Sequence, residues 1–395
     1  MNLDDGEILR YSTGVPADRA IPAQSVPALV PKGRDGWFTP ADRETVLLVL
    51  ALKALIFIFA ILSLRTLFDQ REGWMEMWNR WDALHYQSLA QIGYSATGED
   101  RFSIVFYPLY PWLVRCVAIV SRNYLAAGFL VSGAASIAAA LLLRRLAELD
   151  HPPAVARRAV WFLFIFPTSY FLHIGYTESL FLALSLGCVL AARMNYWAAA
   201  GLLGAGACLT RVNGLLLGPT LLVEAWLQYR ATRRIDWRWL WIGAVGFGFV
   251  GYLYLNYRVT GDFFAFSKIM EEHWYKKFTP PWIGIRDVWL RIPDGDITEG
   301  LHEFVYIVLS FVGMIWSWFR LRPSYAVWMM LNWLLVNSTS FVLSVPRYCL
   351  TFFPLFLLLA LIEAKRPLVG LLVTASSLLF LALFLVKFAH GTWAF

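Results

Sequence analysis

The chain has 395 residues, of which 59% are hydrophobic and 15% are charged, and its formal net charge is +7. A soluble domain carries about 25% charged residues, so this composition excludes an ordinary soluble protein. The basic residues lie in short turns between apolar runs, as in the cytoplasmic loops of membrane proteins, which argues against a nucleic-acid-binding surface. We therefore expect an all-α, polytopic membrane protein.

Residues 1–44 are polar and include five prolines. This predicts a mostly irregular cytoplasmic segment. Residues 45–395 are expected to form a single transmembrane domain of about 11–13 spans. The apolar runs are at about 45–65, 104–121, 124–143, 159–175, 178–192, 197–210, 214–228, 239–257, 304–320, 325–343, 350–363 and 367–387.

Two long connections, 66–102 and 258–303, hold more acidic than basic residues, whereas the short turns are basic. By the positive-inside rule the two long loops face outward. Eight candidate spans precede the second loop, however, and an even number would place the loops on opposite sides. Seven spans would resolve this conflict, so either one early run is re-entrant or membrane-parallel, or two runs form one broken span.

Three apolar runs are interrupted by polar residues, proline or glycine: FYPLYP at 106–111, FPTSYFLHIGY at 166–176 and RVNG at 211–214. Non-helical backbone at membrane depth survives only where it is buried in protein or lines a wet cavity. We therefore expect these interruptions to surround a site.

The first outward loop contains RWDALHY at 80–86, in a stretch from Gly73 to Tyr94 that reads as an amphipathic interfacial helix. Its stripe consists of Trp74, Trp78, Trp81 and His85. Asp82 lies three residues before His85, so the two share a helix face. Such a carboxylate could act as a general base or bind a sugar hydroxyl. The alternative is a solvated interfacial charge paired with a neighbouring arginine.

Three further ionisable residues interrupt apolar sequence. Glu178 begins a run, where it is either functional or part of an ordinary helix cap. Arg211 and Arg347 lie in tight outward turns, against the positive-inside pattern. Their guanidinium groups suit a phosphate, although snorkelling to lipid headgroups is the alternative. No Walker A, GxGxxG, HExxH or GxSxG motif is present, so a transferase here would take its donor from within the membrane.

Five motifs together resemble the PIG-V type of mannosyltransferase, which adds the second mannose of glycosylphosphatidylinositol in eukaryotes and has prokaryotic relatives. They are RWDALHYQSLAQIGY (80–94), FYPLYP (106–111), FPTSYFLHIGYTESLF (166–181), LTRVNG (209–214) and VPRY (345–348). The resemblance implies a GT-C fold with membrane-parallel helices in the first outward loop. It also implies a polyprenyl-phosphate-sugar donor, which is dolichyl-phosphate-mannose in the eukaryotic members.

The resemblance places Asp82 where the family's catalytic base is expected. Substrate-binding roles are expected for the polar motif residues Arg80, His85, Tyr107, Tyr176, Glu178 and Asn213, and donor-phosphate binding for Arg211 and Arg347. No cofactor or divalent metal is implied. The predicted protein is an inverting glycosyltransferase with a lipid or glycan acceptor, in a bacterial inner membrane with its site on the periplasmic face. A secondary transporter or flippase is the alternative, and a scaffold without chemistry is a third reading.

Overall fold

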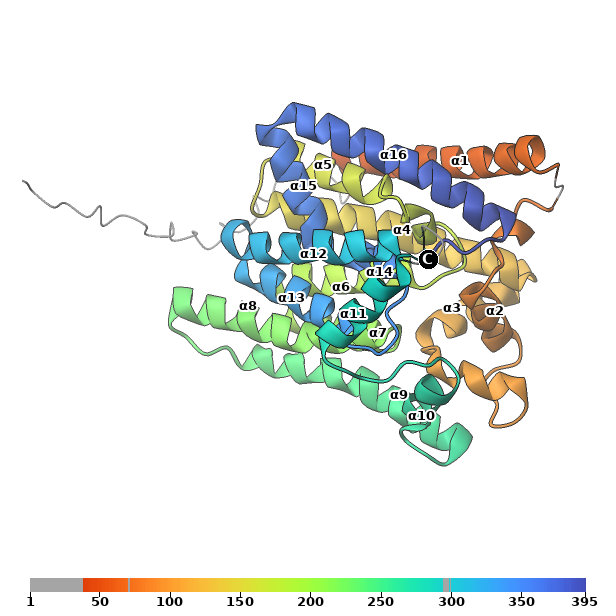
Figure 1. Ribbon diagram of the computed structural model, residues 1–395. Helices are drawn as coiled ribbons and strands as arrows, with labels where there is room; N and C mark the ends of the chain where they lie inside the picture. The colour runs from red at the N-terminus through yellow and green to blue at the C-terminus, as the bar shows by residue number, and fades with distance from the viewer. Residues whose placement is uncertain (1–37, 70–71, 294–297, 299) are drawn as a thin grey trace, which may run out of the picture. The chain divides into compact units, whose positions relative to one another are not determined.

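The structure is a computed structural model that describes residues 38–69, 72–293, 298 and 300–395. Within these residues the regular elements are α-helices and short 3-10 helices, and the predicted all-α class is confirmed. The long helices are α1 (Pro40–Leu67), α4 (Tyr124–Glu148), α6 (Glu178–Arg193), α7 (Trp197–Cys208), α8 (Leu217–Thr232), α9 (Ala244–Thr260), α12 (Leu301–Arg320), α13 (Pro323–Asn337), α15 (Phe353–Lys365) and α16 (Pro367–His390), shown in Figure 1. The shorter α-helices are α2 (Asp82–Gln91), α3 (Leu109–Ser121), α5 (Pro153–Phe164), α10 (Ala265–Glu272), α11 (Pro281–Arg291) and α14 (Val345–Tyr348).

Helix α1 begins at Pro40, five residues before the expected start of the first span. Thr39 and Asp42 form a capping box, which satisfies the free backbone N–H groups of the first turn. The buried carboxylate of Asp42 also pairs with Arg144 and Arg145 of α4. Residues 40–44 of the segment expected to be mostly irregular are therefore helical, and residues 1–37 lie outside the described residues.

Among the described residues, five helices are long and apolar enough to cross a membrane, or seven if each of two bent helix pairs counts as one span. The five are α1, α4, residues 237–260, α12 and α16. Helices α5, α6, α7, α8 and α13 have 12–16 residues, fewer than the roughly 20 that span a bilayer. The count of about 11–13 spans remains a prediction.

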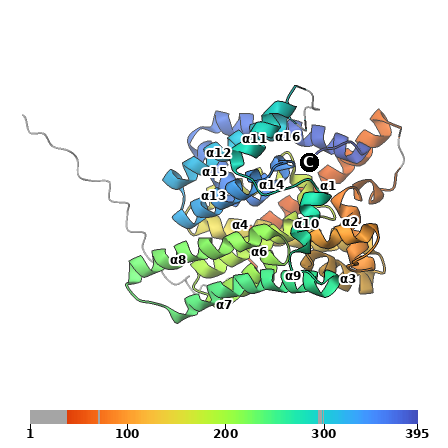
Figure 2. The same ribbon diagram turned by 60° about the horizontal axis from the view of Figure 1, so that its bottom comes forward.

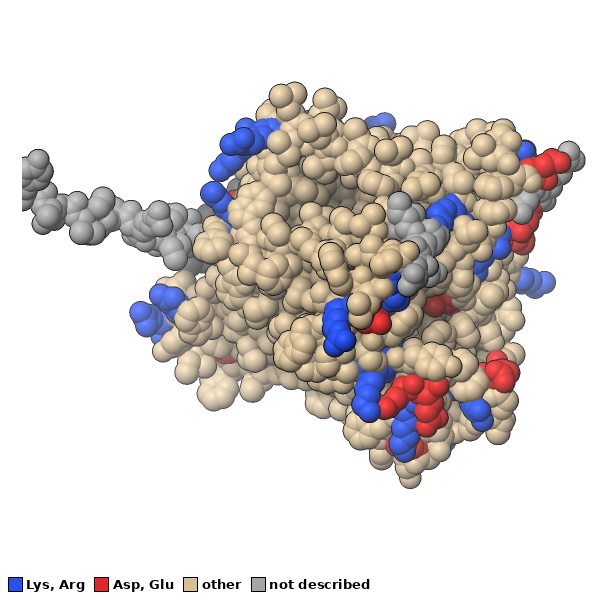
Figure 3. Space-filling model, in the orientation of Figure 1, with Lys and Arg blue, Asp and Glu red and all other residues tan. Residues whose placement is uncertain are grey.

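Helix α4 packs against α6, α6 against α7, and α7 against α9, while α1 and α16 lie side by side. Helices α2, α3 and α10 lie at one end of this arrangement in both views (Figures 1 and 2), and the C-terminal part of α9 reaches the same end. On the face drawn in Figure 3, the left end carries blue basic residues near α8 and the α15–α16 turn, whereas the red acidic residues lie mostly at the right, together with further basic ones. The uncharged surface between these ends suits a membrane-embedded bundle.

The first long loop does not contain the single amphipathic helix expected from Gly73 to Tyr94. A 3-10 turn covers Glu76–Trp78, and α2 begins only at Asp82. Trp81 precedes α2 with a φ of +48°, a left-handed conformation that a helix cannot contain. The predicted tryptophan stripe is therefore broken, although Asp82 and His85 do share α2.

The second long loop is fastened to the segment that precedes α14. The backbone of Lys277 and Thr279 hydrogen-bonds to residues 338–340, and Phe278 forms an isolated antiparallel bridge with Thr339. The hydroxyl of Ser340 accepts a hydrogen bond from the N–H of Lys277, and the N–H of Ser340 donates to the carbonyl of Lys277. The loop and the approach to α14 consequently hold one another in place beside the cavity described next.

Candidate active site

Two of the three interrupted segments, 106–111 and 211–214, line one cavity of about 200 Å³, whereas no residue of 166–176 is in its lining. Its lining comes from the first loop, the breaks near residues 106 and 211, the second loop and α14. The lining residues are Asp82, Tyr86, Val105, Phe106, Tyr107, Thr210, Arg211, Val212, Asn213, Met270, Trp274, Lys276, Arg347 and Tyr348. Segments far apart in the sequence thus build a single pocket lined by both charged and apolar side chains, as expected of backbone breaks inside a membrane protein.

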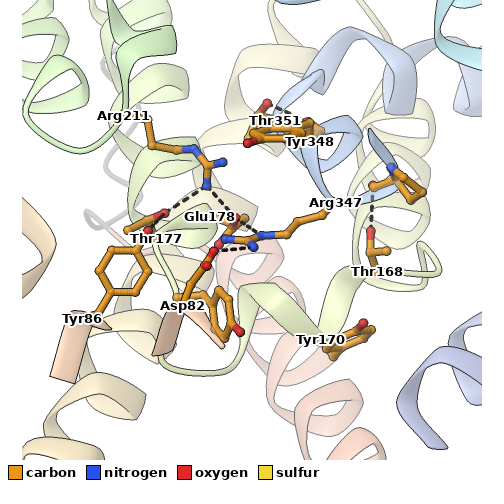
Figure 4. Close-up of polar contacts among 12 residues, drawn as sticks. Asp82, Tyr86, Thr168, Tyr170, Thr177, Glu178, Arg211, Arg347, Tyr348 and Thr351 are labelled. Atoms are coloured by element: carbon orange, nitrogen blue, oxygen red, sulfur yellow. Dashed lines mark hydrogen bonds and ion pairs between the residues drawn. The ribbon is translucent and has the colours of Figure 1, made fainter. Parts of the chain in front are cut away.

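Arg347 bridges two carboxylates in this pocket (Figure 4). Its Nη1 donates to Oδ2 of Asp82 at 2.7 Å, and its Nε donates to Oε1 of Glu178 at 2.5 Å. The guanidinium also lies over the rings of Phe171 and Tyr176, with its Cζ atom 4.8 and 4.7 Å from their centroids. The planar fork and the two aromatic faces fix Arg347 in one orientation.

Arg211 reaches the same Glu178 oxygen from the opposite side (Figure 4). Its Nη1 donates to Oε1 of Glu178 at 2.5 Å and to the hydroxyl of Thr177 at 3.0 Å, and its Cζ lies 5.0 Å from the ring centroid of Tyr348. Glu178 is fully buried at the first position of α6. It therefore acts as the common counterion of two arginines rather than as an ordinary surface helix cap.

The charge of Asp82 depends on this arrangement. Burial raises the pKa of Asp82, but the ion pair with Arg347 and the positive charge of Arg211 lower it more, so that its pKa lies below the ordinary value. Asp82 is therefore a carboxylate at neutral pH. Within the described residues its Oδ2 is the oxygen that hydrogen-bonds Arg347, which leaves Oδ1 available at the cavity wall. Such a carboxylate can accept a proton from a positioned hydroxyl.

Arg347 owes its position to a second buried acid. Glu303, in the first turn of α12, is fully buried and accepts hydrogen bonds from the backbone N–H groups of Ser344 and Val345 at 2.6 and 2.7 Å. Ser344 has a φ of +69°, so the chain turns sharply into α14 at this point. Glu303 holds that turn and with it the direction in which Arg347 leaves the backbone.

His85 lies beside the cavity rather than in its lining. Its Nδ1 is 3.1 Å from the hydroxyl of Ser103, and its ring stacks on Phe106 and meets Trp274 edge to face. Burial lowers the pKa of His85 more than the charge of Asp82 raises it, so the imidazole is neutral at pH 7. Its contacts with two lining aromatics make it a support of the cavity wall.

Two other predicted substrate-binding residues do line the cavity. The Tyr107 hydroxyl is buried without a hydrogen-bond partner among the described residues, and its ring stacks on Tyr252 at 3.9 Å. Asn213 donates to Oδ1 of Asn332 at 2.8 Å and thereby ties its turn to α13. Tyr107 is the better candidate for a substrate contact, since its hydroxyl still lacks a partner.

Arg80 and Tyr176, for which substrate-binding roles are expected, are not among the residues that line the cavity. Arg80 donates to Glu72 and to the backbone oxygens of Met77 and Ala389, which joins the first loop to the end of α16. Tyr176 is buried with its ring against the guanidinium of Arg347, and its hydroxyl donates to the backbone oxygen of Arg80 at 2.8 Å. Both motif residues thus hold the loop that carries Asp82, and their substrate-binding roles stay predictions.

The sequence motifs did not single out four groups at or near the site: Tyr86, Lys276, Glu303 and Tyr348. Tyr86 and Tyr348 belong to quoted motifs, and their positions beside Asp82 and Arg347 were a usable signal. Lys276 and Glu303 carry no local signal. The pairing of the second loop with residues 338–340 brings Lys276 here, and hydrogen bonds to Ser344 and Val345 place Glu303. Among the described residues no group of three or more His, Cys, Asp or Glu side chains gathers as a metal site.

The fold is similar to that of ArnT from Cupriavidus metallidurans, solved with undecaprenyl phosphate, with a TM-score of 0.50 and 17% identity over 86% of this chain and 69% of ArnT. The archaeal oligosaccharyltransferase AglB from Archaeoglobus fulgidus, solved with an inhibitory peptide and a dolichol-phosphate, gives a TM-score of 0.43 and 11% identity over 88% of this chain and 56% of AglB. With its apolar helices and its likeness to ArnT, the chain is an integral membrane protein with a GT-C-type fold.

The sequence is 35% identical to GPI mannosyltransferase 2 of Yarrowia lipolytica over 147 residues, which are 36% of this chain and 39% of that relative. The chain is thus PIG-V-like over this stretch, in agreement with the resemblance found in its motifs. No protein-family model matches the chain. The matched stretch is shorter than the 265 positions between Asp82 and Arg347, so the similarity includes at most one partner of this ion pair.

Proposed function

We propose that the protein is a membrane-embedded inverting glycosyltransferase, a mannosyltransferase that moves a sugar from a polyprenyl-phosphate donor to a lipid-linked or cell-envelope acceptor. The observation that carries this proposal is the position of Asp82: an ionised carboxylate, oriented by Arg347, in the wall of a cavity that also exposes Arg211. A base and a cation facing one space are what an inverting transfer to a hydroxyl requires.

The reaction follows from this geometry. The free oxygen of Asp82 takes the proton of an acceptor hydroxyl as the hydroxyl oxygen attacks the anomeric carbon of the donor. A new carbon–oxygen bond forms on the face opposite the bond to the phosphate, which breaks with its electron pair remaining on the phosphate oxygen. The products are the inverted glycoside, a polyprenyl phosphate and a protonated Asp82, which returns its proton to water.

Arg347 and Glu178 orient the base in this scheme. A carboxylate held by one fixed guanidinium keeps its second oxygen in one direction, so little reorganisation is needed as the proton moves. The depressed pKa makes Asp82 a weak base in the resting site. Approach of a negatively charged donor phosphate weakens the hold of the arginines and raises the basicity of Asp82 when substrate is bound.

The known relatives support the lipid nature of the substrates. The structural relative ArnT was solved with undecaprenyl phosphate, and the sequence relative is a GPI mannosyltransferase. A polyprenyl carrier suits a site within a GT-C-type membrane fold that has no soluble nucleotide-binding domain among its described residues. We propose a bacterial inner membrane as the location, with the cavity on the periplasmic face, because the two loops that line it are the acidic ones.

The test is turnover by the purified protein in lipid nanodiscs. Polyprenyl-phosphate-[¹⁴C]mannose is supplied with an extract of membrane lipids as acceptor, and both the labelled product and the released polyprenyl phosphate are measured. Transfer with one phosphate released per sugar supports the proposal. Movement of intact donor across proteoliposomes without cleavage would instead show a flippase.

A further inference from the structure

The charges of the cavity separate into a neutral group and one remaining cation. Asp82 and Glu178 carry two negative charges, and Arg211 and Arg347 carry two positive ones, all joined by hydrogen bonds of 2.5–2.7 Å. Each arginine is thus largely compensated before any substrate arrives. The remaining charged residue of the lining is Lys276 of the second loop.

The other lysines of this loop are engaged elsewhere. Lys268 pairs with Asp262 at 2.6 Å, and Lys277 pairs with Glu271 at 2.9 Å, both on the exposed surface. Among the described residues, Lys276 has no carboxylate within ion-pair distance, although it is half-buried in the cavity wall. A half-buried ammonium without a counterion is costly unless a ligand supplies the negative charge.

Hydrogen bonds fix the backbone of Lys276 and of the residue that follows it. The N–H of Lys276 donates to the carbonyl of Met270 at 2.9 Å, which closes the turn after α10. Tyr275, with a φ of +55°, reverses the chain immediately before it. Lys277 then pairs with Ser340 through both of its backbone groups. Lys276 therefore lines the cavity from a short segment that is anchored on both sides.

We propose that Lys276 binds the donor phosphate, together with the outward N–H groups of Arg211, whereas Arg347 serves the two carboxylates. This inference rests on the proposed function; it keeps Arg211 at the phosphate, as the sequence suggested, and puts Lys276 there in place of Arg347. The net charge of +1 fits a lipid phosphodiester, which carries one negative charge. The unpartnered hydroxyl of Tyr107, on the same lining, supplies a further donor to the sugar or the phosphate.

Lys276 also has a role in the departure of the phosphate. When the bond between the anomeric carbon and the phosphate oxygen breaks, the electron pair stays on that oxygen and the phosphate gains a second negative charge. A fixed ammonium at this place stabilises the added charge without reorganisation. Because its interaction with the phosphate grows during bond cleavage, its removal lowers kcat as well as donor affinity.

The test compares undecaprenyl phosphate with undecaprenol as ligands of the full-length protein in nanodiscs, by thermal unfolding and by titration. Lys276→Ala is expected to weaken binding of the phosphate about 10- to 100-fold, the range of one charge-assisted contact, and to leave undecaprenol binding unchanged. Lys276→Arg should stay within a few-fold of wild type. Lys277→Ala is the matched control, since it removes the neighbouring lysine whose partner is Glu271.

Each result has a definite meaning. Lys276→Ala binding the phosphate as well as Lys277→Ala does would overturn the inference, as would equal weakening of phosphate and undecaprenol, because that pattern indicates a distorted cavity. Failure of wild type to bind undecaprenyl phosphate overturns it too. Lys276-dependent phosphate binding without any sugar transfer would uphold this site and refute the proposed function.

Discussion

Asp82 and Arg347 are joined by a hydrogen bond of 2.7 Å although 265 positions of the chain separate them. The same guanidinium contacts Glu178, so that one side chain orients two acids from different segments. This relationship places the base of the proposed reaction at the cavity wall. It also makes the site sensitive to changes in either partner, in ways that kinetics can separate.

Asp82→Asn removes the proton acceptor and keeps the shape of the side chain. We expect transfer to fall at least 10²-fold, in the range usual for loss of a general base, while the melting temperature changes little because Arg347 keeps Glu178. Initial rates with polyprenyl-phosphate-mannose measure the first effect. Asp262→Asn on the exposed second loop is the control, and near-normal rates in Asp82→Asn would remove this residue from the mechanism.

Arg347→Gln changes the pH dependence of the reaction. The pKa of Asp82 lies below its ordinary value in the wild type, so the carboxylate stays ionised as the pH falls to that depressed value. Without Arg347, burial dominates and the pKa of Asp82 rises. The acid limb of kcat/KM should then move to higher pH, in rates recorded from about pH 4.5 to 8.5. An unchanged acid limb would contradict the coupling of these two residues.

Gly214→Ala tests the turn that carries Arg211. A methyl group on Gly214 would lie 2.3 Å from the backbone nitrogen of Cys208, and backbone cannot give way as a flexible side chain can. We expect the free energy of unfolding to decrease by about 1–3 kcal/mol, the usual cost of overpacking, and the rate of sugar transfer to fall. Gly218→Ala, where an added Cβ meets no atom within 4 Å, is the matched control. Equal melting temperatures in the two variants would show that the turn adapts.

Glu303→Ala leaves the N–H groups of Ser344 and Val345 buried without their acceptor. The expected cost is about 1–3 kcal/mol for each group, and Arg347 loses its fixed direction. The melting temperature should therefore fall. Because Glu303 acts through Arg347, kcat should decrease more than the affinity for the donor does. Glu271→Ala, on the exposed part of the second loop, gives the baseline. If kcat is retained despite lower stability, Glu303 stabilises the turn without orienting Arg347.

The sequence predicted the fold class and pointed to several residues that line the cavity because the signals were local. Apolar runs define helices wherever they occur, and Glu178, Arg211 and Arg347 stand out as charges in apolar surroundings. The interruptions at 106–111 and 211–214 mark non-helical backbone that the structure places around the cavity. These features can be recognised from a few neighbouring residues.

Features that depend on distant parts of the chain were missed or misread. Arg80 looks like a site residue in RWDALHY, but its partners include Ala389, more than 300 positions away. The periodicity from Gly73 to Tyr94 predicted one helix, yet the turn at Trp81 breaks it. Lys276 lies in a loop of mixed charge, and only the pairing with residues 338–340 brings it to the cavity. Tertiary contacts decided each of these cases.

The separation of Asp82 from Arg347 also sets an order of events during synthesis. Glu178 can pair with Arg211 soon after both leave the ribosome, because only 33 positions separate them. Asp82 must wait until the ribosome has added residues up to Arg347, when most of the helices already exist. A nascent or truncated chain that stops before VPRY therefore has a paired Glu178 and a base without its guanidinium. Assembly of the complete charge network therefore requires synthesis of the chain through Arg347.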